Sequence, residues 1–335
     1  MKIAVVILNY NGQEHLRHYL PSVVENSAGA DIVVADNGST DGSLALLAAE
    51  FSSVRVVALD KNYGFAEGYN RAIAQVGEYD YVVLLNSDVY TPEGWLQPLM
   101  AQLDSDSTIA AVGSKVLSDT DRTKFEYAGA SGGFIDYLGY PFCRGRVLSE
   151  LEEDRGQYDD AREVFWVSGA AICVRRSIYE QLGGLCGRFF AHMEEIDLCW
   201  RMQLAGYKVV IEPKSVVYHL GGGTLAANSP RKILLNHRNN LAMLFRCASP
   251  LQRVVVAIVR PMTDFAAAMG YILGGNKEGA RSVLIAWRDF IRWHKVLAAE
   301  RQQIRSTAKR ESPYIYKGMI VLRYLFGKRK FDNII

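Results

Sequence analysis

The chain has 335 residues, of which 49% are hydrophobic and 22% are charged. This composition is typical of a globular protein and excludes a wholly disordered chain or a collagen-like repeat. The length allows one large domain or two smaller ones. Five widely spaced cysteines without a C-x-x-C pair favour a reducing cytosol over a disulfide framework or a structural zinc site. Only six apolar residues follow Met1-Lys2, which does not predict a secretory signal.

Charge is distributed unevenly along the chain. Residues 1–227 contain 18 Lys and Arg against 30 Asp and Glu, a net charge of −12. Residues 228–335 contain 20 and 6, a net charge of +14. This asymmetry predicts two parts with different partners: an acidic domain suited to metal-assisted chemistry, and a basic region suited to a polyanion or an anionic lipid surface.

The first hundred residues alternate short apolar runs, which predict strands, with segments of helical periodicity. The predicted strands are residues 3–8, 31–35, 54–59, 81–85 and 109–116. The predicted helices between them are residues 13–26, 41–51, 65–76 and 92–103. Repeated strand–helix–strand units predict an α/β fold with a mostly parallel, doubly wound sheet flanked by helices.

The middle of the chain is less regular. Residues 125–146 are rich in Gly, Tyr and Phe and predict hairpins or a loop, and the acidic residues 149–160 predict a solvated, mobile segment. We then expect one long strand, a helix and two short strands, at residues 163–175, 192–205, 208–212 and 215–219. Long helices with many Arg follow Ser229.

Polar clusters stand where three predicted strands end. These clusters are Asn9 with Asn11, Asp36 with Asn37, and Asn86 with Ser87 and Asp88. Ligands of such sheets bind outside the carboxyl ends of the strands, so the clusters should meet in one crevice. A carboxylate there suits a hard divalent cation that also binds diphosphate oxygens, although an Asx turn explains the same residues.

Two further segments contain candidate functional residues. The turn with Asn62, Gly64 and Asn70 enters a helix and can offer backbone N–H groups to phosphate or base, or it is simply a tight turn. His219 ends a predicted strand and is either a metal ligand, a phosphate contact or a structural residue.

Three carboxylates lie within one turn of the helix predicted at residues 192–205. Glu194 and Asp197 share a face, whereas Glu195 points about 100° away from Glu194. Acids at a helix start also stabilise the helix dipole, which is the structural explanation. The apolar neighbours Phe189, Phe190 and Trp200 favour a buried carboxylate with a raised pKa, suited to act as a general base.

Taken in this order, the motifs resemble the family 2 glycosyltransferases with the GT-A fold, and most of all rhamnosyltransferases of bacterial surface-polysaccharide pathways. The resemblance extends over about residues 3–225. The matching segments are residues 6–12, 36–43, 62–70, 84–89 and 194–201, followed by Gly206-Tyr207.

The resemblance implies a role for most of these residues. Asp36 would contact the nucleotide of a sugar donor, together with Asn9, Asn11, Asn37, Asn62, Gly64 and Asn70. Asn86-Ser87-Asp88 replaces the D-x-D motif of the family, with Asp88 as a ligand of Mg²⁺ or Mn²⁺ and His219 as a further ligand. Glu195 occupies the position of the catalytic base, with Glu194 as its rival.

The acceptor side is expected to contain Asp197, Trp200, Arg201 and Arg188. The family often has G-G-[FL]-D-E before its two Phe residues, and this chain instead has Gly183-Gly184-Leu185-Cys186-Gly187-Arg188. The resemblance implies inverting transfer of a sugar, with rhamnose favoured, from a dTDP- or UDP-sugar to a glycan or polyprenyl-linked acceptor in cell-surface polysaccharide synthesis. The alternative is a non-catalytic nucleotide-sugar-binding or scaffolding protein at the membrane.

The basic region leaves its own alternatives open. Residues 251–273 are apolar but contain Arg253, Arg260 and Asp264, each of which costs about 2.5–3.5 kcal/mol near the middle of a membrane. An amphipathic pair at the interface is therefore favoured over a spanning helix. Residues 314–330 combine apolar and basic side chains. They could bind an anionic inner leaflet, pack as a helix on the enzyme domain, or self-associate into a homo-oligomer. Nucleic acid is not an expected partner, and we expect a cytoplasmic protein, peripheral on the inner face of the plasma membrane if this region binds lipid.

Overall fold

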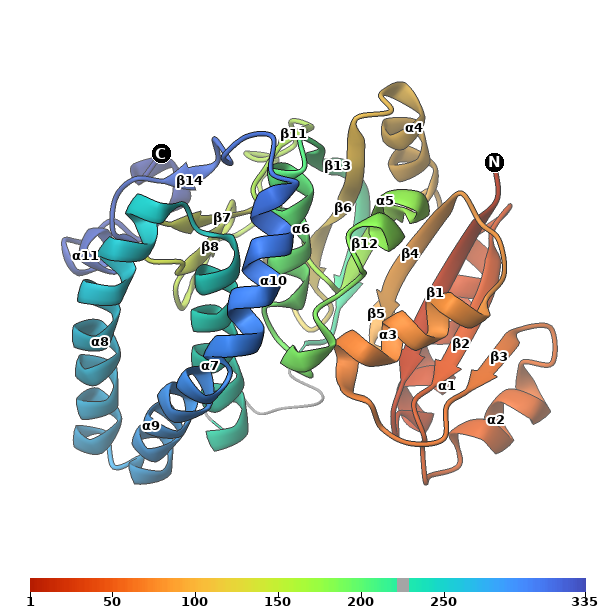
Figure 1. The fold of residues 1–335 in the computed structure, drawn as a ribbon. Helices are drawn as coiled ribbons and strands as arrows, with labels where there is room; N and C mark the ends of the chain where they lie inside the picture. Colours follow the sequence, from red (N-terminus) through yellow and green to blue (C-terminus); the bar gives the residue numbers. More distant parts are fainter. Residues whose placement is uncertain (222–228) are drawn as a thin grey trace.

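The computed structural model describes residues 1–221 and 229–335, so the domain boundary predicted between residues 227 and 228 lies outside the described residues. A central sheet has helices on both faces, and a group of C-terminal helices stands beside it (Figure 1). The predicted α/β fold with a mostly parallel sheet and a helical basic region is confirmed.

The first half of the chain alternates strands and helices as predicted: β1 (Ile3–Asn9), α1 (Gln13–Asn26), β2 (Asp31–Asp36), α2 (Ser43–Glu50), β3 (Arg55–Ala58), α3 (Gly64–Gln75), β4 (Tyr81–Asn86), β5 (Val89–Tyr90), α4 (Gln97–Ser105) and β6 (Ile109–Ser118). The apolar run of β1 is buried on both faces because helices cover both sides of the sheet. Helix α4 begins five residues later than predicted, because Gly94 has a φ of +78°, which a helix does not adopt.

The order of strands in the main sheet is β11-β13-β6-β12-β4-β1-β2-β3, with β5 paired to β13. Strand β1 lies between β2 and β4, and all three are parallel. Asn9 is in register with Asp36, and Leu8 is in register with Asn86. The polar residues that end these three strands therefore lie side by side at one edge.

Two sequence-based predictions about the later strands are wrong. The predicted strand at residues 163–175 is two strands, β11 (Arg162–Glu163) and antiparallel β12 (Ala171–Arg175), because Phe165 and Trp166 turn away to bond with Gly133 of another sheet. The two short strands predicted at residues 208–219 are one strand, β13 (Lys208–His219), with a register shift between Glu212 and Val216. Pro213 lies in this shift and has no N–H for the ladder.

A second, smaller sheet contains β7 (Gly133–Asp136), β8 (Pro141–Cys143), β9 (Arg146–Val147), β10 (Glu150–Leu151) and β14 (Ile315–Tyr316). Its hairpins occupy the segment where hairpins or a loop were predicted. The acidic segment at residues 149–160 is not the freely solvated one expected. The ammonium of Lys115 lies 2.7 Å from Asp154 and 2.6 Å from Asp159, and Tyr158 is buried.

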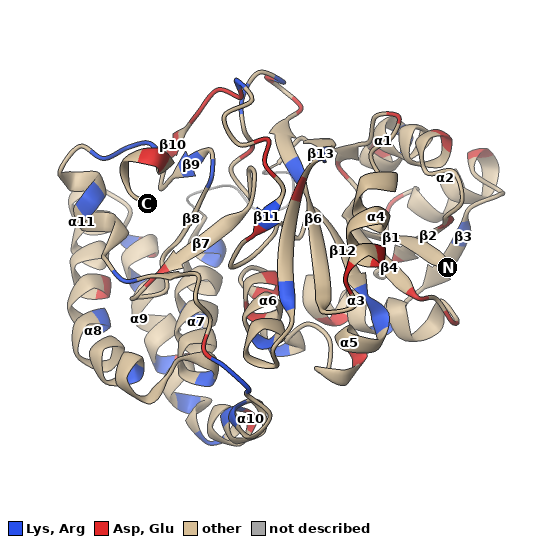
Figure 2. Ribbon diagram, turned by 90° about the horizontal axis from the view of Figure 1, so that it is seen from above, with Lys and Arg blue, Asp and Glu red and all other residues tan. Residues whose placement is uncertain are grey.

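Five helices follow Ser229: α7 (Pro230–Cys247), α8 (Pro250–Leu273), α9 (Lys277–Arg292), α10 (His294–Ser306) and α11 (Ile320–Leu325). Helices α7 and α10 pack against α6 (Glu194–Leu204), while α8 stands on the outside of the group (Figure 1). The helix pair expected at residues 251–273 is wrong, because α8 is one continuous helix. By length and composition, α8 is the helix among the described residues that could cross a membrane. Lys and Arg residues are spread over this group of helices (Figure 2).

Candidate active site

Buried polar side chains surround Asp36 at the end of β2. The Asn9 amide donates to Asp36 Oδ1 at 3.1 Å, and the backbone N–H of Ser39 donates to Asp36 Oδ2 at 2.9 Å. Asn11 lies beside it at the surface, where its Oδ1 accepts from the Thr40 N–H at 2.7 Å. The sheet register and these bonds fix the Asp36 carboxylate at the carboxyl edge of the sheet.

The turn before α3 lies against the same polar cluster. The Asn37 amide donates to Asn62 Oδ1 at 3.2 Å and to the Gly64 carbonyl at 3.0 Å. Gly64 has a φ of +79°, and a side chain there would come within 2.5 Å of the Phe190 ring. Glycine at position 64 therefore allows this turn to contact the segment that precedes α6.

Pairing of β5 with β13 brings Asp88 and His219 together, although they are 131 residues apart. The distance from His219 Nε2 to Asp88 Oδ1 is 3.1 Å, and that to Asn86 Nδ2 is 3.3 Å. Burial alone would raise the pKa of Asp88, but the hydrogen bond and charge of His219 outweigh it and lower that pKa. Asp88 is thus an ionised carboxylate at the edge of the sheet.

Glu126 is a third charged member of this group that sequence reasoning missed. Its Oε2 lies 3.5 Å from His219 Nδ1, and its side chain is buried. Burial lowers the pKa of His219, but the hydrogen bond to Asp88 and the nearby carboxylates of Asp88 and Glu126 raise it to about 10. The only signal in the sequence is an acid within the Phe- and Tyr-rich segment that starts the second sheet.

The acidic pair follows a strained turn. Phe190, His192 and Met193 all have positive φ, at 67°, 71° and 73°, which non-glycine residues rarely adopt. Such strain persists only where surrounding contacts enforce it, and it gathers at functional sites. The carbonyl of Phe190 accepts from the N–H of Phe65 at 2.6 Å, which joins this turn to the start of α3.

Asn239 of α7 holds this turn in place. Its side-chain amide donates to the carbonyls of Phe189, Ala191 and His192 at 2.9, 2.8 and 2.9 Å, and Asn239 itself is fully buried. A residue of the basic C-terminal region therefore positions the residues that begin α6. Nothing in the local sequence around Asn239 distinguishes it from a surface residue.

Glu195 lies at the same edge as Asp88. Its Cβ is 3.5 Å from the position that a side chain on Gly169 would take. The next carbonyl, that of Ala170, accepts from the Asn86 N–H at 3.0 Å. This short connection brings the acidic pair to the end of β4, so Asp36, Asp88 and Glu195 lie at one side of the sheet.

The two glutamates differ in exposure. Glu194 is buried, whereas Glu195 is partly exposed. Burial raises the pKa of Glu195 to about 7, and burial together with the charge of Glu195 raises the pKa of Glu194 well above its usual value. Each has one carboxylate oxygen without a hydrogen-bond partner among the described residues. A partly exposed carboxyl with a pKa near neutrality suits a general base.

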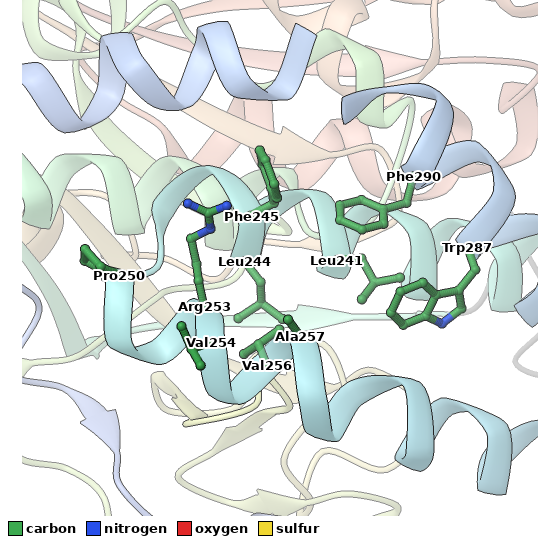
Figure 3. Close-up of a pocket in the computed structure, with 10 residues that line it drawn as sticks. All are labelled: Leu241, Leu244, Phe245, Pro250, Arg253, Val254, Val256, Ala257, Trp287 and Phe290. Carbon is green, nitrogen blue, oxygen red and sulfur yellow. The ribbon is translucent and has the colours of Figure 1, made fainter. Parts of the chain in front are cut away.

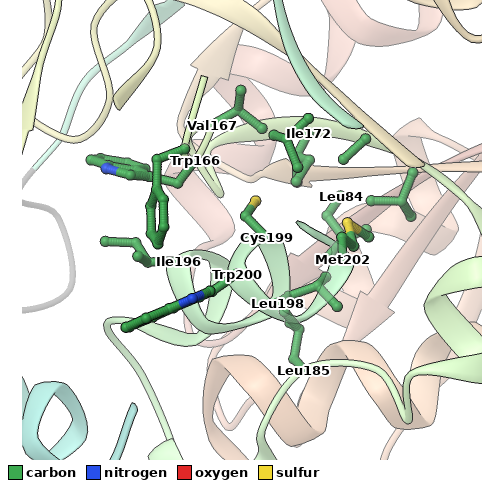
Figure 4. Packing of buried hydrophobic residues seen from close by; sticks show 14 of the residues in the cluster. Leu84, Trp166, Val167, Ile172, Leu185, Ile196, Leu198, Cys199, Trp200 and Met202 are labelled. Atoms are coloured by element: carbon green, nitrogen blue, oxygen red, sulfur yellow. The ribbon is translucent and has the colours of Figure 1, made fainter. Parts of the chain in front are cut away.

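Three residues expected on the acceptor side belong to the core instead. Trp200 is fully buried and packs against Phe165 with ring centroids 5.3 Å apart (Figure 4). Asp197 is fully buried, 2.7 Å from Arg201 Nε and 2.6 Å from Arg246 Nη1. Trp200 therefore packs on the segment after β11 and Asp197 pairs with α7, so these buried residues fix α6 in place.

Arg188 and Asn70 also have structural contacts. Arg188 lies 3.5 Å from Glu300, with its guanidinium 5.5 Å from the Trp293 ring centroid. Asn70 bonds both the N–H and the carbonyl of Leu185, at 2.9 and 2.8 Å. Asn70 therefore holds the turn before Arg188, and it is not free to contact a donor.

The residues around Asp88 provide part of a cation site. Within residues 1–221 and 229–335, no group of three His, Cys, Asp or Glu side chains is arranged to hold a metal ion. Asp88 contributes a carboxylate, and Asn86 has a buried Oδ1 without a partner in the described part of the chain. Carboxylate and amide oxygens suit Mg²⁺ and Mn²⁺, so these residues fit a cation that takes its other ligands from a diphosphate.

The fold and this edge define a glycosyltransferase of the GT-A class. GalNAc-T7 with UDP, GalNAc and Mn²⁺ superposes with a TM-score of 0.61 at 16% identity, over 78% of this chain and 50% of that one. Residues 1–349 of S. aureus TarS in complex with UDP-GlcNAc give a TM-score of 0.58 at 15% identity, over 98% and 93% of the two chains.

The model of glycosyl transferase family 2 matches residues 4–183, and the chain belongs to this family. It is similar to the N-acetylglucosaminyl-diphospho-decaprenol L-rhamnosyltransferase of Mycobacterium tuberculosis, with 28% identity over 72% of this chain and 83% of that protein. Rhamnosyltransferase WbbL of Escherichia coli is 22% identical over 65% of this chain and 83% of its own length. The expected family and its rhamnosyltransferase-like character are confirmed.

Proposed function

We propose that this glycosyltransferase moves a sugar, with inversion, from a nucleoside diphosphate sugar to a hydroxyl group of a glycan or lipid-linked acceptor. One observation carries the proposal: Glu195, partly exposed and with a raised pKa, lies at the same edge of the sheet as Asp36 and Asp88. Single-displacement sugar transfer requires a base close to the edge that binds the nucleotide.

In this reaction the Glu195 carboxylate accepts the proton of the acceptor hydroxyl. The acceptor oxygen forms a bond to the anomeric carbon while the bond from that carbon to the diphosphate oxygen breaks. The bonding electrons leave with the nucleoside diphosphate, and no covalent enzyme intermediate forms. The apolar wall of Phe65 and Gly169 beside Glu195 keeps the base poorly solvated, which maintains its raised pKa.

The donor would lie along the edge of the sheet. Asp36, with Asn9, Asn11, Asn37 and Asn62, would contact the nucleoside, since these side chains surround the end of β2. Asp88 and Asn86, with Ser87 between them, would hold Mg²⁺ or Mn²⁺ near the diphosphate. Such a cation, when bound, neutralises charge on the departing diphosphate. His219 would contact phosphate as an imidazolium or join the cation after losing its proton.

The similarity to rhamnosyltransferases favours a dTDP-rhamnose donor, with UDP-sugars as the other class. The M. tuberculosis relative is named for a decaprenol-linked acceptor. By analogy we propose a polyprenyl-linked or glycan acceptor in cell-surface polysaccharide synthesis. Such an acceptor is held in a bilayer, so we propose that the enzyme acts in the cytoplasm, against the inner membrane surface.

A screen of dTDP- and UDP-sugars tests the proposal, with Mn²⁺, Mg²⁺ or EDTA present. We expect one donor class to raise the Tm of the full chain in a metal-dependent way and to release nucleoside diphosphate when the acceptor is added. Protection by NAD and not by any nucleotide sugar would contradict the proposal. Donor binding without turnover on any glycan or lipid-linked acceptor would favour the scaffolding alternative.

A further inference from the structure

Helix α8 has an outward face without polar side chains. Every exposed residue between Pro250 and Leu273 is apolar, proline or glycine. Met262 and Phe265 are 69% and 64% exposed, and Leu273 is 84% exposed. A soluble protein usually places polar residues on the exposed face of a helix, so this continuous apolar stripe indicates an apolar environment.

Arg260 and Asp264 of α8 point inward and are buried. The Arg260 guanidinium donates to the carbonyl of Leu138 at 2.8 Å and to Asp264 at 3.1 Å. Asp264 also accepts from the Trp287 indole of α9 at 3.0 Å. These bonds fix one face of α8 to the protein, so α8 cannot cross a bilayer alone without breaking them.

An apolar groove lies beside the stripe, between α7, α8 and α9 (Figure 3). It has a volume of about 560 Å³. Its wall includes Leu241, Val254, Ala257 and Phe290, of which Val254 and Ala257 also belong to the exposed face of α8. Arg253 lines it too, with its guanidinium 4.5 Å from the Phe245 ring centroid. An apolar groove with a cation in its wall suits the chain and headgroup of an anionic lipid.

Exposed cations stand near both ends of the stripe. Lys277 and Arg281 follow the turn between α8 and α9, and Lys328, Arg329 and Lys330 follow α11. Helix α11 adds exposed Leu325 and Phe326, and both α8 and the start of α11 bond to the loop at residues 136–138. Figure 2 shows α11 and α8 at the same side of the molecule.

We propose that the outward face of α8, with Leu325 and Phe326 of α11, is a docking surface for an anionic lipid bilayer. The helix lies in the plane of the interface, its stripe among the acyl chains and the flanking cations on the headgroups. A second copy of this chain fits less well, since both ends of the stripe are basic and a paired stripe brings cations together. The tip of the α8–α9 hairpin points toward the end of the molecule where β1 and β4 finish (Figure 1).

The docking proposal rests on the proposed function in one respect only: the proposed function gives the reason for docking, which is to reach a lipid-linked acceptor. Its test needs no sugar transfer, so the two proposals fail separately. The full chain is sedimented with vesicles of phosphatidylcholine alone and of phosphatidylcholine with phosphatidylglycerol. We expect binding to the anionic vesicles, weaker binding to the neutral ones, and a decline with added salt.

The paired substitution Met262→Gln and Phe265→Gln should reduce vesicle binding about tenfold or more, since it removes two large apolar side chains from the stripe. The matched control is Leu44→Gln with Val56→Gln, which removes two exposed apolar side chains from the other side of the chain, 42% and 39% exposed. The control should bind like the wild type. Both variants should keep the Tm increase that a nucleotide sugar produces.

A fluorescent probe tests the orientation. All five cysteines are buried, so Ile258→Cys provides a single accessible site for an environment-sensitive dye, with Val56→Cys as its control. Anionic vesicles should shift the emission to the blue only for the label at position 258. Equal shifts at both positions, or equal vesicle binding by the Met262/Phe265 variant, would overturn the proposal. Dimerisation through the stripe without vesicle binding would also overturn it.

Discussion

The carboxyl edge of the sheet and the outward face of α8 are opposites: the edge buries polar atoms, whereas α8 exposes apolar side chains. At the edge, oxygen atoms of Asn86, Glu194 and Glu195 are buried with no partner within the described residues. In α8 the polar groups of Arg260 and Asp264 are bonded inside, and apolar side chains are exposed. An unpaired buried polar atom and an exposed apolar stripe both cost free energy. The first is relieved by a polar ligand and the second by an apolar phase, as the proposed transfer from a nucleotide sugar to a membrane-bound acceptor requires.

Glu195→Gln is the most direct test of sugar transfer at the sheet edge, because it removes the proposed base. Loss of the base should lower kcat by about 10²- to 10⁴-fold. The Tm increase produced by the nucleotide sugar should remain, because Gln keeps the shape of the side chain. Glu194→Gln is the matched control and should cost less, and a larger loss there would make Glu194 the base. Equal loss of donor binding in the Glu195 variant would remove Glu195 from this role.

Arg246→Met should have the largest effect on stability. Arg246 lies 2.6 Å from buried Asp197 and 2.9 Å from Glu300, and its removal leaves Asp197 with Arg201 alone. We expect a loss of about 3 kcal/mol in the free energy of unfolding, measured by denaturant titration. Arg188→Met is the control, because Arg188 pairs with the same Glu300 at 3.5 Å while partly exposed. It should cost about 0–1 kcal/mol, and equal losses would refute the structural role given to Asp197.

Asn239→Ala tests whether the C-terminal helices position the acidic pair. The carbonyls of Ala191 and His192 lose the Asn239 donor, whereas that of Phe189 keeps Arg238, and we expect a loss of about 1–3 kcal/mol in stability together with a fall in kcat. Gln252→Ala is the control on the neighbouring helix α8, since buried Gln252 donates to the Tyr137 carbonyl at 3.0 Å, away from that turn. It should lose stability while kcat stays near the wild-type value. A similar fall in kcat for both variants would mean that Asn239 has no positioning role.

The pH dependence of transfer gives the smallest effect. Because burial raises the pKa of Glu195 to about 7, the base is protonated below that pH. The value of kcat/KM should rise about tenfold per pH unit up to about pH 7 and then level off. The folded state keeps this proton where the unfolded chain has lost it, so the free energy of unfolding should fall as pH rises from about 4.5 to about 7. A rate that does not change with pH below 7 would contradict a base with this pKa.

The sequence predicted the position of the functional edge of the sheet better than it predicted the role of each side chain. Asp36, Asp88 and Glu195 follow strand ends or a helix start that local patterns identify. Trp200 and Asp197 belong to the same motif as Glu195, but their direction depends on Phe165 and on Arg246 of α7, which are distant in sequence. Glu126 was missed because an irregular hairpin segment gives no periodic signal for the direction of its side chain.

The sequence by itself determined the alternation of strands and helices, the polar strand ends and the presence of an acidic pair. These features depend on periodicity and residue type within short segments, which act before distant contacts form. Only the tertiary structure decided which face of each helix is buried. It turned Asp197 inward on α6 and left Phe265 outward on α8, because the partner that covers a helix face comes from elsewhere in the chain.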